Sequence, residues 1–535
     1  LSQHQGSVER VFRDLVTPEN ENRETRLTPF ALFWAGGSED ANTSIIEAFS
    51  VFLNETGFND VENIVSYLVQ LREAPQFKRL TEDSQRKLAQ LIESLVEKIA
   101  AYPQQEILLD RVGRILKALA GRKIYISLLI EYPATQLQML TLCAASEWFA
   151  ERLVKHPVLL DSLLSTAEVF RKRYDIEQLL ELELARIESV AGRTGDELEL
   201  QMDRFRQFKR QMVFTIAMLD VFYAEPVESV SDRLTELANI LLEKILHLSW
   251  SAMVEKYGEP ACIIEGELFR PAMSIVAYGK MGGNELGYGS DLDIIFLHNS
   301  GGEKQYTSGE RSVDNQHFFA RVAQRVIHFL NTHTYSGILY EVDTRLRPDG
   351  QAGLMVSSIH AFEVYQHEKA WSWEHQALIR ARFVAGDALL EQEFARIRSS
   401  VLRQERDPAR LLQEVVVMRE KMRDHLANKT EGFDVKQDSG GLIDIEFMTQ
   451  AGVLLHAEKY GSCIRHTATL ALIDELTKAG WYGPDDAANI ADAYRYFRKL
   501  KNWHNLECEI DDSDISLHRE NVASVWGRLM PRKES

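Results

Sequence analysis

The stretch YGKMGGNELGYGSDLDIIFLH (278–298) changes from a glycine-rich segment into an alternating acidic and apolar run. The run predicts a strand. Because strand side chains alternate with period two, Asp291 and Asp293 are expected on one face and the apolar residues between them on the core face. Neighbouring carboxylates repel each other unless a cation lies between them, and Mg²⁺ is commonly held by a few carboxylates and substrate phosphates. The stretch therefore indicates a site for a nucleotide–metal complex.

A third acid lies about fifty residues later. In GILYEVDTRLRPDG (337–350), strand-like alternation places Asp343 in mid-strand with Arg345 and Arg347 on the same face, and the run stops at a Pro-Asp-Gly turn. A helical pattern over 314–334 separates the two strands, which can therefore lie adjacent. Three carboxylates can hold two metal ions that align an attacking oxygen with a phosphoryl leaving group. The alternative is that Asp343 only pairs with one of the two arginines.

The glycines before the acids favour close approach of a phosphate. Gly279 ends a predicted strand, and Gly282 and Gly283 follow it. Backbone without a Cβ atom can approach phosphate oxygens and offer N–H donors. The order of residues is not GxxxxGK[ST], which excludes a P-loop, and it is not strand–GxGxxG–helix either. Lys280 is a candidate phosphate ligand or an ordinary surface lysine, and Ser290 either holds phosphate or caps a turn.

The rest of the chain is mostly helical in pattern. Apolar residues recur at i, i+3, i+4 and i+7 from about residue 40 to 190, and AGRTGDE (191–197) has the composition of a linker. Two long helices follow, short strands begin near residue 270, and helices return from about 405. We therefore expect a predominantly α-helical α+β protein with a small strand-bearing unit between helical parts.

Composition excludes several classes of function. The chain has 535 residues, 45% of them hydrophobic, and a net charge of −19, which argues against a nucleic-acid substrate because polyanions bind cationic surfaces. Four scattered cysteines without a CxxC pattern fit a reducing cytosol and no structural zinc. No apolar run suits a membrane span, and the first residues lack a signal core. We expect a cytoplasmic protein, and Leu at position 1 suggests a fragment of a longer one.

The spacing of Gly279, Asp291, Asp293 and Asp343 resembles the nucleotidyltransferase superfamily of DNA polymerase β. Within that superfamily the chain is similar to the glutamine synthetase adenylyltransferase family over roughly residues 120–510. The segments that carry this similarity are the stretch quoted first, YEVDTRLRPDG, WSWEHQALIRARFVAGD, DSGGLIDIEFMTQ and LTLCAASEWFAERLVKHPVLLDSLL.

That family has two related nucleotidyltransferase halves, one adding AMP and one removing it. GYGSDLD, with helices before and after it, resembles the adding half. The resemblance implies an N-terminal segment from the missing removing half at 1–40, a helical regulatory domain at 41–192, a nucleotidyltransferase domain with leading long helices at 197–390, and a C-terminal helical domain at 400–535.

The implied reaction is attack by a tyrosine hydroxyl of glutamine synthetase on the α-phosphate of ATP, which releases pyrophosphate and regulates nitrogen assimilation. Asp291 and Asp293 would bind two Mg²⁺ ions, Asp343 would complete one site and act as general base, and Arg345 and Arg347 would neutralise phosphate charge. The alternatives are the phosphorolytic AMP-removing activity and a non-catalytic docking module. The family also implies the PII signalling protein as a partner and glutamine as an effector.

Two further pairs remain open at this point. Arg380 and Arg382 fall on one face of a predicted strand, where they suit either phosphate or the protein's own carboxylates. Asp444 and Glu446 follow two glycines, so they either occupy the favourable first turn of a helix or face the nucleotide.

Overall fold

The computed structural model describes residues 28–35, 39–164, 176–182, 197–425 and 432–531. By compactness the chain divides into one unit of residues 1–144 and 150–164 and a second of residues 145–149 and 165–535. Most of the expected N-terminal segment and the linker at 191–196 lie outside the described residues.

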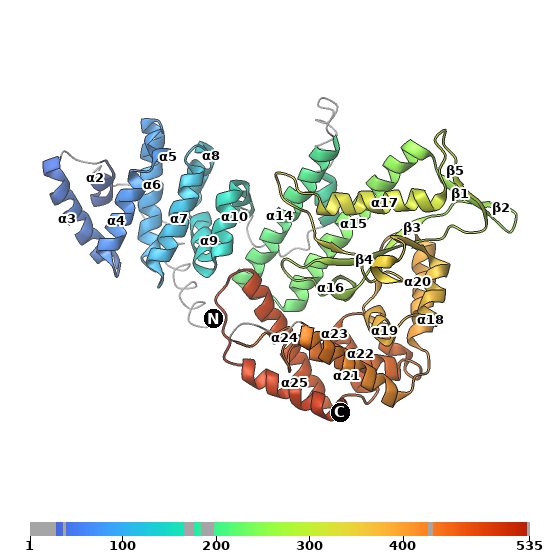
Figure 1. Ribbon diagram of the computed structural model, residues 1–535. Helices are drawn as coiled ribbons and strands as arrows, with labels where there is room; N and C mark the ends of the chain where they lie inside the picture. Colours follow the sequence, from blue (N-terminus) through green and yellow to red (C-terminus); the bar gives the residue numbers. More distant parts are fainter. Residues whose placement is uncertain (1–27, 36–38, 165–175, 183–196, 426–431, 532–535) are drawn as a thin grey trace. The chain divides into compact units, whose positions relative to one another are not determined.

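The described part of the first unit consists of consecutive helices (Figure 1). They are α2 (Pro29–Ala35), α3 (Glu39–Thr56), α4 (Val61–Arg72), α5 (Pro75–Lys78), α6 (Glu82–Ile99), α7 (Gln105–Leu119), α8 (Lys123–Glu131), α9 (Pro133–Ala145), α10 (Glu147–Lys155), the 3₁₀ turn η1 (Pro157–Leu160) and α11 (Asp161–Leu164). In α6 the residues at helical spacing, from Leu88 to Ile99, form one buried face. This burial stabilises the helix far more than its intrinsic propensity does.

The second unit begins with two long helices and continues into the strands. The elements up to the last strand are α14 (Glu197–Tyr223), α15 (Val227–Tyr257), β1 (Pro260–Ile264), β2 (Glu267–Phe269), β3 (Met273–Ala277), α16 (Gly279–Gly282), β4 (Leu292–His298), β5 (Glu303–Thr307), α17 (Asn315–Asn331), β6 (Val342–Asp343), η2 (Gly350–Ala352), β7 (Val356–Ser358), α18 (Ile359–Glu368), α19 (Ser372–Ile379) and β8 (Arg382–Gly386).

The remaining elements of this unit are helical. They are α20 (Ala388–Leu402), α21 (Pro408–His425), α22 (Leu442–His456), η3 (Gly461–Ile464), α23 (Thr469–Lys478), α24 (Pro484–Asn505) and α25 (Ile515–Leu529).

The central sheet has the order β6-β4-β3-β8, with β7 also pairing with β4. β3 is antiparallel to both β4 and β8, whereas β6 and β7 run parallel to β4. A separate antiparallel sheet has the order β2-β1-β5 and lies beside α17 (Figure 1). The helix α15 packs against β8, and α17 packs against β6 and β7.

Both faces of the central sheet are covered. Val276, Ile295 and Leu297 belong to the same hydrophobic core as the buried residues of helices α18–α25. The alternate residues Ile275 and Ile294 are also fully buried, on the opposite face of the strands. The sheet and the C-terminal helices therefore share one core.

The expected fold class is confirmed, because the chain is a predominantly helical α+β protein with a small sheet between helical parts. One predicted element is much shorter than expected: only Val342 and Asp343 of the stretch 337–350 pair as a strand. The N–H groups of Leu339 and Tyr340 both donate to the carbonyl oxygen of Leu330 at the end of α17, which ties the start of the stretch to that helix. No helix among the described residues is long and apolar enough to cross a membrane.

Candidate active site

Three carboxylates meet at one end of the central sheet. Asp293 lies in β4 directly opposite Asp343 in the parallel strand β6. Asp291 lies one residue before β4 and is exposed, whereas Leu292 between the two aspartates is fully buried. Although β6 has only two residues, its register with β4 sets Asp343 beside Asp293.

The electrostatics of Asp293 reflect this crowding. Burial, together with the charges of Asp291 and Asp343, raises the pKa of Asp293 to about 6, while Arg380 and Lys280 oppose the rise. The local field thus penalises a full set of ionised carboxylates unless positive charge is added. A divalent cation would supply that charge, and carboxylate oxygens are the ligands that Mg²⁺ prefers.

Both carboxylate oxygens of Asp343 are bound by Arg345. The backbone N–H and the Nε of Arg345 both donate to its carboxylate at 2.7 Å. These bonds, and above all the one from the guanidinium, lower the pKa of Asp343. Among the described residues no three His, Cys, Asp or Glu side chains are arranged to hold a metal ion. The donor set is of the right chemistry, and Asp343 would have to leave Arg345 to join it.

The glycines of the quoted stretch provide space for side chains of the protein itself. Gly279 has φ +55°, and a Cβ atom there would lie 2.2 Å from Oδ2 of Asp293. At Gly282 a Cβ atom would lie 1.8 Å from the carbonyl oxygen of Arg380, and at Gly283 it would lie 2.9 Å from the Nε of that arginine. In this structure these three glycines let the loop pack closely on Asp293 and Arg380.

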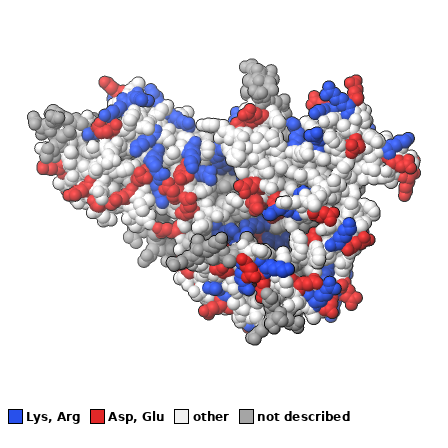
Figure 2. Space-filling model, in the orientation of Figure 1, with Lys and Arg blue, Asp and Glu red and all other residues white. Residues whose placement is uncertain are grey.

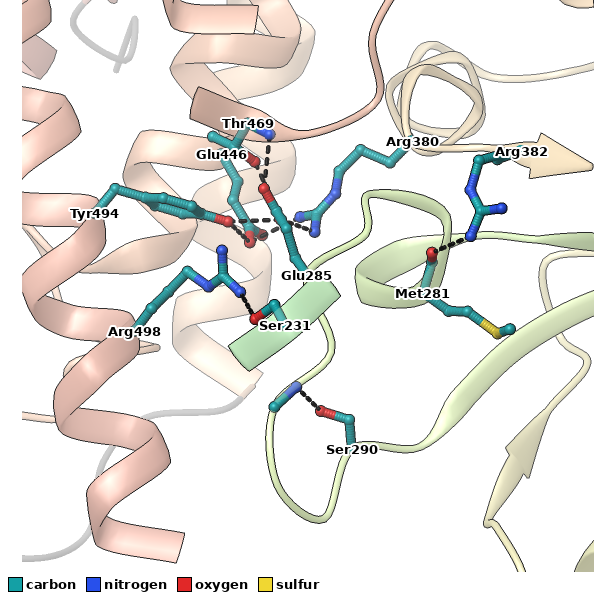
Figure 3. Close-up of polar contacts among 11 residues, drawn as sticks. Ser231, Met281, Glu285, Ser290, Arg380, Arg382, Glu446, Thr469, Tyr494 and Arg498 are labelled. Atoms are coloured by element: carbon teal, nitrogen blue, oxygen red, sulfur yellow. Dashed lines mark hydrogen bonds and ion pairs between the residues drawn. The ribbon is translucent and has the colours of Figure 1, made fainter. Parts of the chain in front are cut away.

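Two of the predicted phosphate ligands have local partners. The Oγ of Ser290 accepts a hydrogen bond from the N–H of Gly287 at 3.0 Å, which is the turn-capping alternative (Figure 3). Arg347 is buried, and its guanidinium donates to the carbonyl oxygens of Thr344, Gln351 and Gly353. Arg345, by contrast, is an exposed cation beside the carboxylates.

A buried polar cluster fastens the glycine-rich loop to the C-terminal helices (Figure 3). Arg380 forms ion pairs with Glu285 of the loop and with Glu446 of α22, the second at 2.8 Å. Glu285 also accepts from the N–H of Thr469 and from the hydroxyl of Tyr494, both at 2.7 Å. Although burial opposes ionisation, Arg380 and these donors hold the pKa of Glu285 below its usual value. We call Glu285, Arg380, Glu446, Thr469 and Tyr494 the clamp.

The two pairs left open by the sequence bind the protein itself. Arg380 belongs to the clamp, and Arg382 donates to the carbonyl oxygen of Met281 and to Asn239, each at 3.2 Å. Asp444 pairs with Arg419 at 2.6 Å and accepts from the N–H of Gly440. Glu285 was missed, although a lone acid within a glycine-rich loop is a signal that such a residue has a buried partner.

Lysines from distant segments also gather beside the carboxylates. The positive charges of Lys436, from the segment before α22, and of Lys501, from α24, contribute to lowering the pKa of Lys280. The negative charge of Asp291 in turn acts on the pKa of Lys501. Figure 2 shows Lys and Arg atoms in a recess near the centre of the face drawn, between α16 and the C-terminal helices. Spacing alone does not indicate Lys436 or Lys501, because they lie far from the motif in sequence.

Comparison with known proteins places this site in a family. The family model described as glutamate-ammonia ligase adenylyltransferase matches residues 136–397, which include all three carboxylates. Over these residues the chain is similar to this family. A second model, described as GlnD PII-uridylyltransferase, matches residues 412–527, the C-terminal helices.

Curated relatives match nearly the whole chain. A protein of Thioalkalivibrio sulfidiphilus is 38% identical over 543 residues, covering 99% of this chain and 55% of the relative. Proteins of Pseudomonas putida and Vibrio parahaemolyticus are each 36% identical, covering 98% of this chain and 54% and 55% of themselves. All three are named bifunctional glutamine synthetase adenylyltransferase/adenylyl-removing enzyme. The chain spans about half the length of these relatives.

Proposed function

We propose that this chain transfers AMP from ATP to a tyrosine hydroxyl of glutamine synthetase and releases pyrophosphate. The observation that carries the proposal is the register that sets Asp293 opposite Asp343, with Asp291 two residues before Asp293, inside the region matched by the adenylyltransferase family model. Converging carboxylates beside cations suit phosphoryl chemistry, because the acids recruit metal ions and the cations balance phosphate charge.

Asp291 and Asp293 would hold two Mg²⁺ ions, and Asp343 would complete one of the sites. When bound, the ions would supply positive charge at the phosphate and favour an ionised attacking oxygen. Asp343 is ionised at neutral pH, and release of Arg345, whose hydrogen bond lowers its pKa, would make it a stronger base for the tyrosine proton. Arg345 is exposed and free to turn from Asp343 towards a phosphate oxygen.

The family context supports further parts of the proposal. The relatives' name covers both adding and removing AMP, and half of their length is matched. We assign the adding reaction to this chain from the GYGSDLD pattern, and we expect a cytoplasmic protein regulated by PII and glutamine. Residues 41–192 would form the regulatory part, 197–390 the nucleotidyltransferase and 400–535 the C-terminal helical part.

The test is incubation of the chain with glutamine synthetase, Mg²⁺ and ATP labelled on the α-phosphate. Label on a synthetase tyrosine is expected, and Asp293→Asn should reduce the transfer rate by at least a hundredfold, because a metal ligand is lost. Asp314→Asn makes the same change at the exposed N-terminus of α17, where Asn also caps a helix, and should keep full activity.

A second reaction separates the alternatives. Pre-adenylylated synthetase is incubated with the chain and inorganic phosphate, and ADP is measured. ADP release without labelling in the first reaction would assign the removing activity instead. Neither product, with synthetase still bound, would indicate a docking module.

A further inference from the structure

Three half-buried lysines converge without a carboxylate partner. Lys280 lies on α16, Lys436 in the segment 432–441 before α22, and Lys501 on α24. Among the residues that the structure describes, none of their ammonium groups is in an ion pair or a hydrogen bond, whereas most other buried cations of this unit are paired. Carboxylates do lie near them, since Glu446 acts on the pKa of both Lys280 and Lys501, and Asp434 and Asp291 act on that of Lys501, but these acids offset burial and the mutual repulsion of the lysines only in part.

The position of Lys501 follows from the packing of α24 along the glycine-rich loop. Tyr494 and Lys501 lie seven residues apart and therefore on the same face of the helix. Tyr494 donates to Glu285 at 2.7 Å, and Asn505 donates to the carbonyl oxygen of Tyr288 at 2.6 Å. Lys501, between these two anchors, is thereby held against the loop that carries Lys280.

The position of Lys436 follows from the start of α22. The carbonyl oxygen of Lys436 accepts from the N–H of Ile443 at 3.3 Å, and that of Val435 accepts from Leu442 at 2.8 Å. These bonds fix the segment on the first turn of α22, and Glu446 of the same helix pairs with Arg380. The clamp thus brings all three lysines to one place.

The lysines influence one another and face the acids. Burial, then the charges of Lys501 and Lys436, lowers the pKa of Lys280 to about 8. Burial and Lys436 also lower the pKa of Lys501. The charge of Lys280 opposes the rise in the pKa of Asp293, and the charge of Asp291 opposes the fall in the pKa of Lys501. The cations therefore adjoin the candidate metal ligands. An anion held here would lie directly beside the carboxylates.

We propose that Lys280, Lys436 and Lys501 form a binding site for a polyphosphate chain, assembled jointly by the glycine-rich loop and the C-terminal helices. Three cations balance most of the charge of a triphosphate or a pyrophosphate, whereas a single orthophosphate carries less charge than the three lysines together. That the polyphosphate belongs to ATP rests on the proposed function; the binding site itself does not. Lys436 and Lys501 thereby make the C-terminal helices part of the nucleotide site.

The experiment measures calorimetrically how the intact chain binds sodium tripolyphosphate, pyrophosphate and orthophosphate without metal. Lys436→Met and Lys501→Met should each weaken tripolyphosphate at least tenfold, because a charge-assisted hydrogen bond is lost. Arg at the same positions should restore most of the affinity. Lys459→Met, which removes the same charge from an exposed position near the end of α22, should leave affinity within a factor of two.

Thermal unfolding separates binding from structure. A lysine that only stabilises the fold would lower the melting temperature when replaced. The proposed role predicts an equal or higher melting temperature for the Met variants, because a repulsive charge is removed.

The proposal is overturned if the Met variants bind tripolyphosphate as tightly as the parent does, or if Lys459→Met loses as much tripolyphosphate affinity as they do. It is also overturned if orthophosphate binds as tightly as tripolyphosphate and is the anion whose affinity the Met substitutions chiefly reduce. It is supported if lysine-dependent tripolyphosphate binding is found even in a chain that fails to label glutamine synthetase. If the chain labels glutamine synthetase but the variants bind tripolyphosphate as tightly as the parent does, the proposed function stands and the proposed lysine site is wrong.

Discussion

Position 279 must be glycine because one oxygen atom of Asp293 occupies the space that a Cβ atom would need. Its φ of +55° lies in the left-handed region, and an added Cβ atom would lie 2.2 Å from Oδ2 of Asp293. The glycine therefore leaves room for the carboxylate proposed to bind metal. Gly289, ten residues later in the same loop, has φ +72° with nothing within 4 Å of its Cβ position. The two positions separate backbone strain from crowding.

We predict that Gly279→Ala displaces the Asp293 side chain, reduces the proposed AMP transfer by more than a hundredfold and destabilises the protein by roughly 2–4 kcal/mol through strain plus overpacking. Gly289→Ala should cost only about 1 kcal/mol and keep its activity. Urea unfolding and the labelling assay measure both effects. Equal losses at the two positions would contradict the role given to the Asp293 oxygen.

Asp220 of α14 gives a pH-dependent prediction away from the site. It is 3% exposed, and burial raises its pKa to about 6 despite a hydrogen bond from Tyr288. Between pH 4 and 6 the folded state keeps a proton that the unfolded state releases, so this group's contribution to stability is lost as pH rises through that window.

Asp220→Asn removes the titrating carboxyl. As pH rises from 4 to 7, the unfolding free energy of the variant should increase by about 1–3 kcal/mol relative to that of the parent. Denaturant melts at a series of pH values measure the difference. Parallel stability curves for the two proteins across this range would show that burial does not disturb this carboxyl.

At the scale of elements, the clamp connects the glycine-rich loop to α22, α23 and α24. Glu285 and Arg380 are both nearly fully buried, and each has more than one charged or hydroxyl partner. Replacing one member of a buried ion pair leaves the other uncompensated, which is far more harmful than losing an exposed pair.

Glu285→Gln should therefore lower the unfolding free energy by about 3–5 kcal/mol. The matched control is Glu151→Gln, which breaks an exposed i,i+4 pair with Lys155 on α10 and should cost less than about 1 kcal/mol. Guanidinium melts monitored by tryptophan fluorescence measure both. If the two variants were equally stable, Glu285 would not hold the loop to the helices.

The elements differ in how well the sequence predicts them. Local periodicity predicts α6 and the strand that carries Asp293, because those signals lie within one turn or one strand, whereas Asp291 lies one residue before that strand. It overestimates the strand around Asp343, since the attachment to Leu330 is a contact outside the motif. The partners of Arg380 and the lysine site come from remote segments, which a spacing pattern does not encode.

For the whole molecule, the decisive quantity is the contrast between global and local charge. The chain carries 80 acidic against 61 basic residues, yet the recess beside the carboxylates is lined by cations. A short polyphosphate can enter such a recess, whereas a long polyanion also meets the acidic surroundings.

We accordingly predict that duplex DNA shows no measurable affinity at physiological salt in fluorescence anisotropy, under conditions in which tripolyphosphate binds. Tripolyphosphate competition is the control for the recess. Salt-sensitive DNA binding that is abolished by tripolyphosphate would instead indicate that the cations are open to large polyanions.

The clamp also has a consequence for synthesis. Glu285 and its partner Tyr494 are 209 residues apart. A ribosome that has just completed β6 has already made every carboxylate of the site, but α24, with Tyr494 and Lys501, is not yet translated. Nascent chains that terminate before α24 would thus carry the acids without the helix that aligns the loop, and Tyr494 can hold the loop only after α24 has been translated.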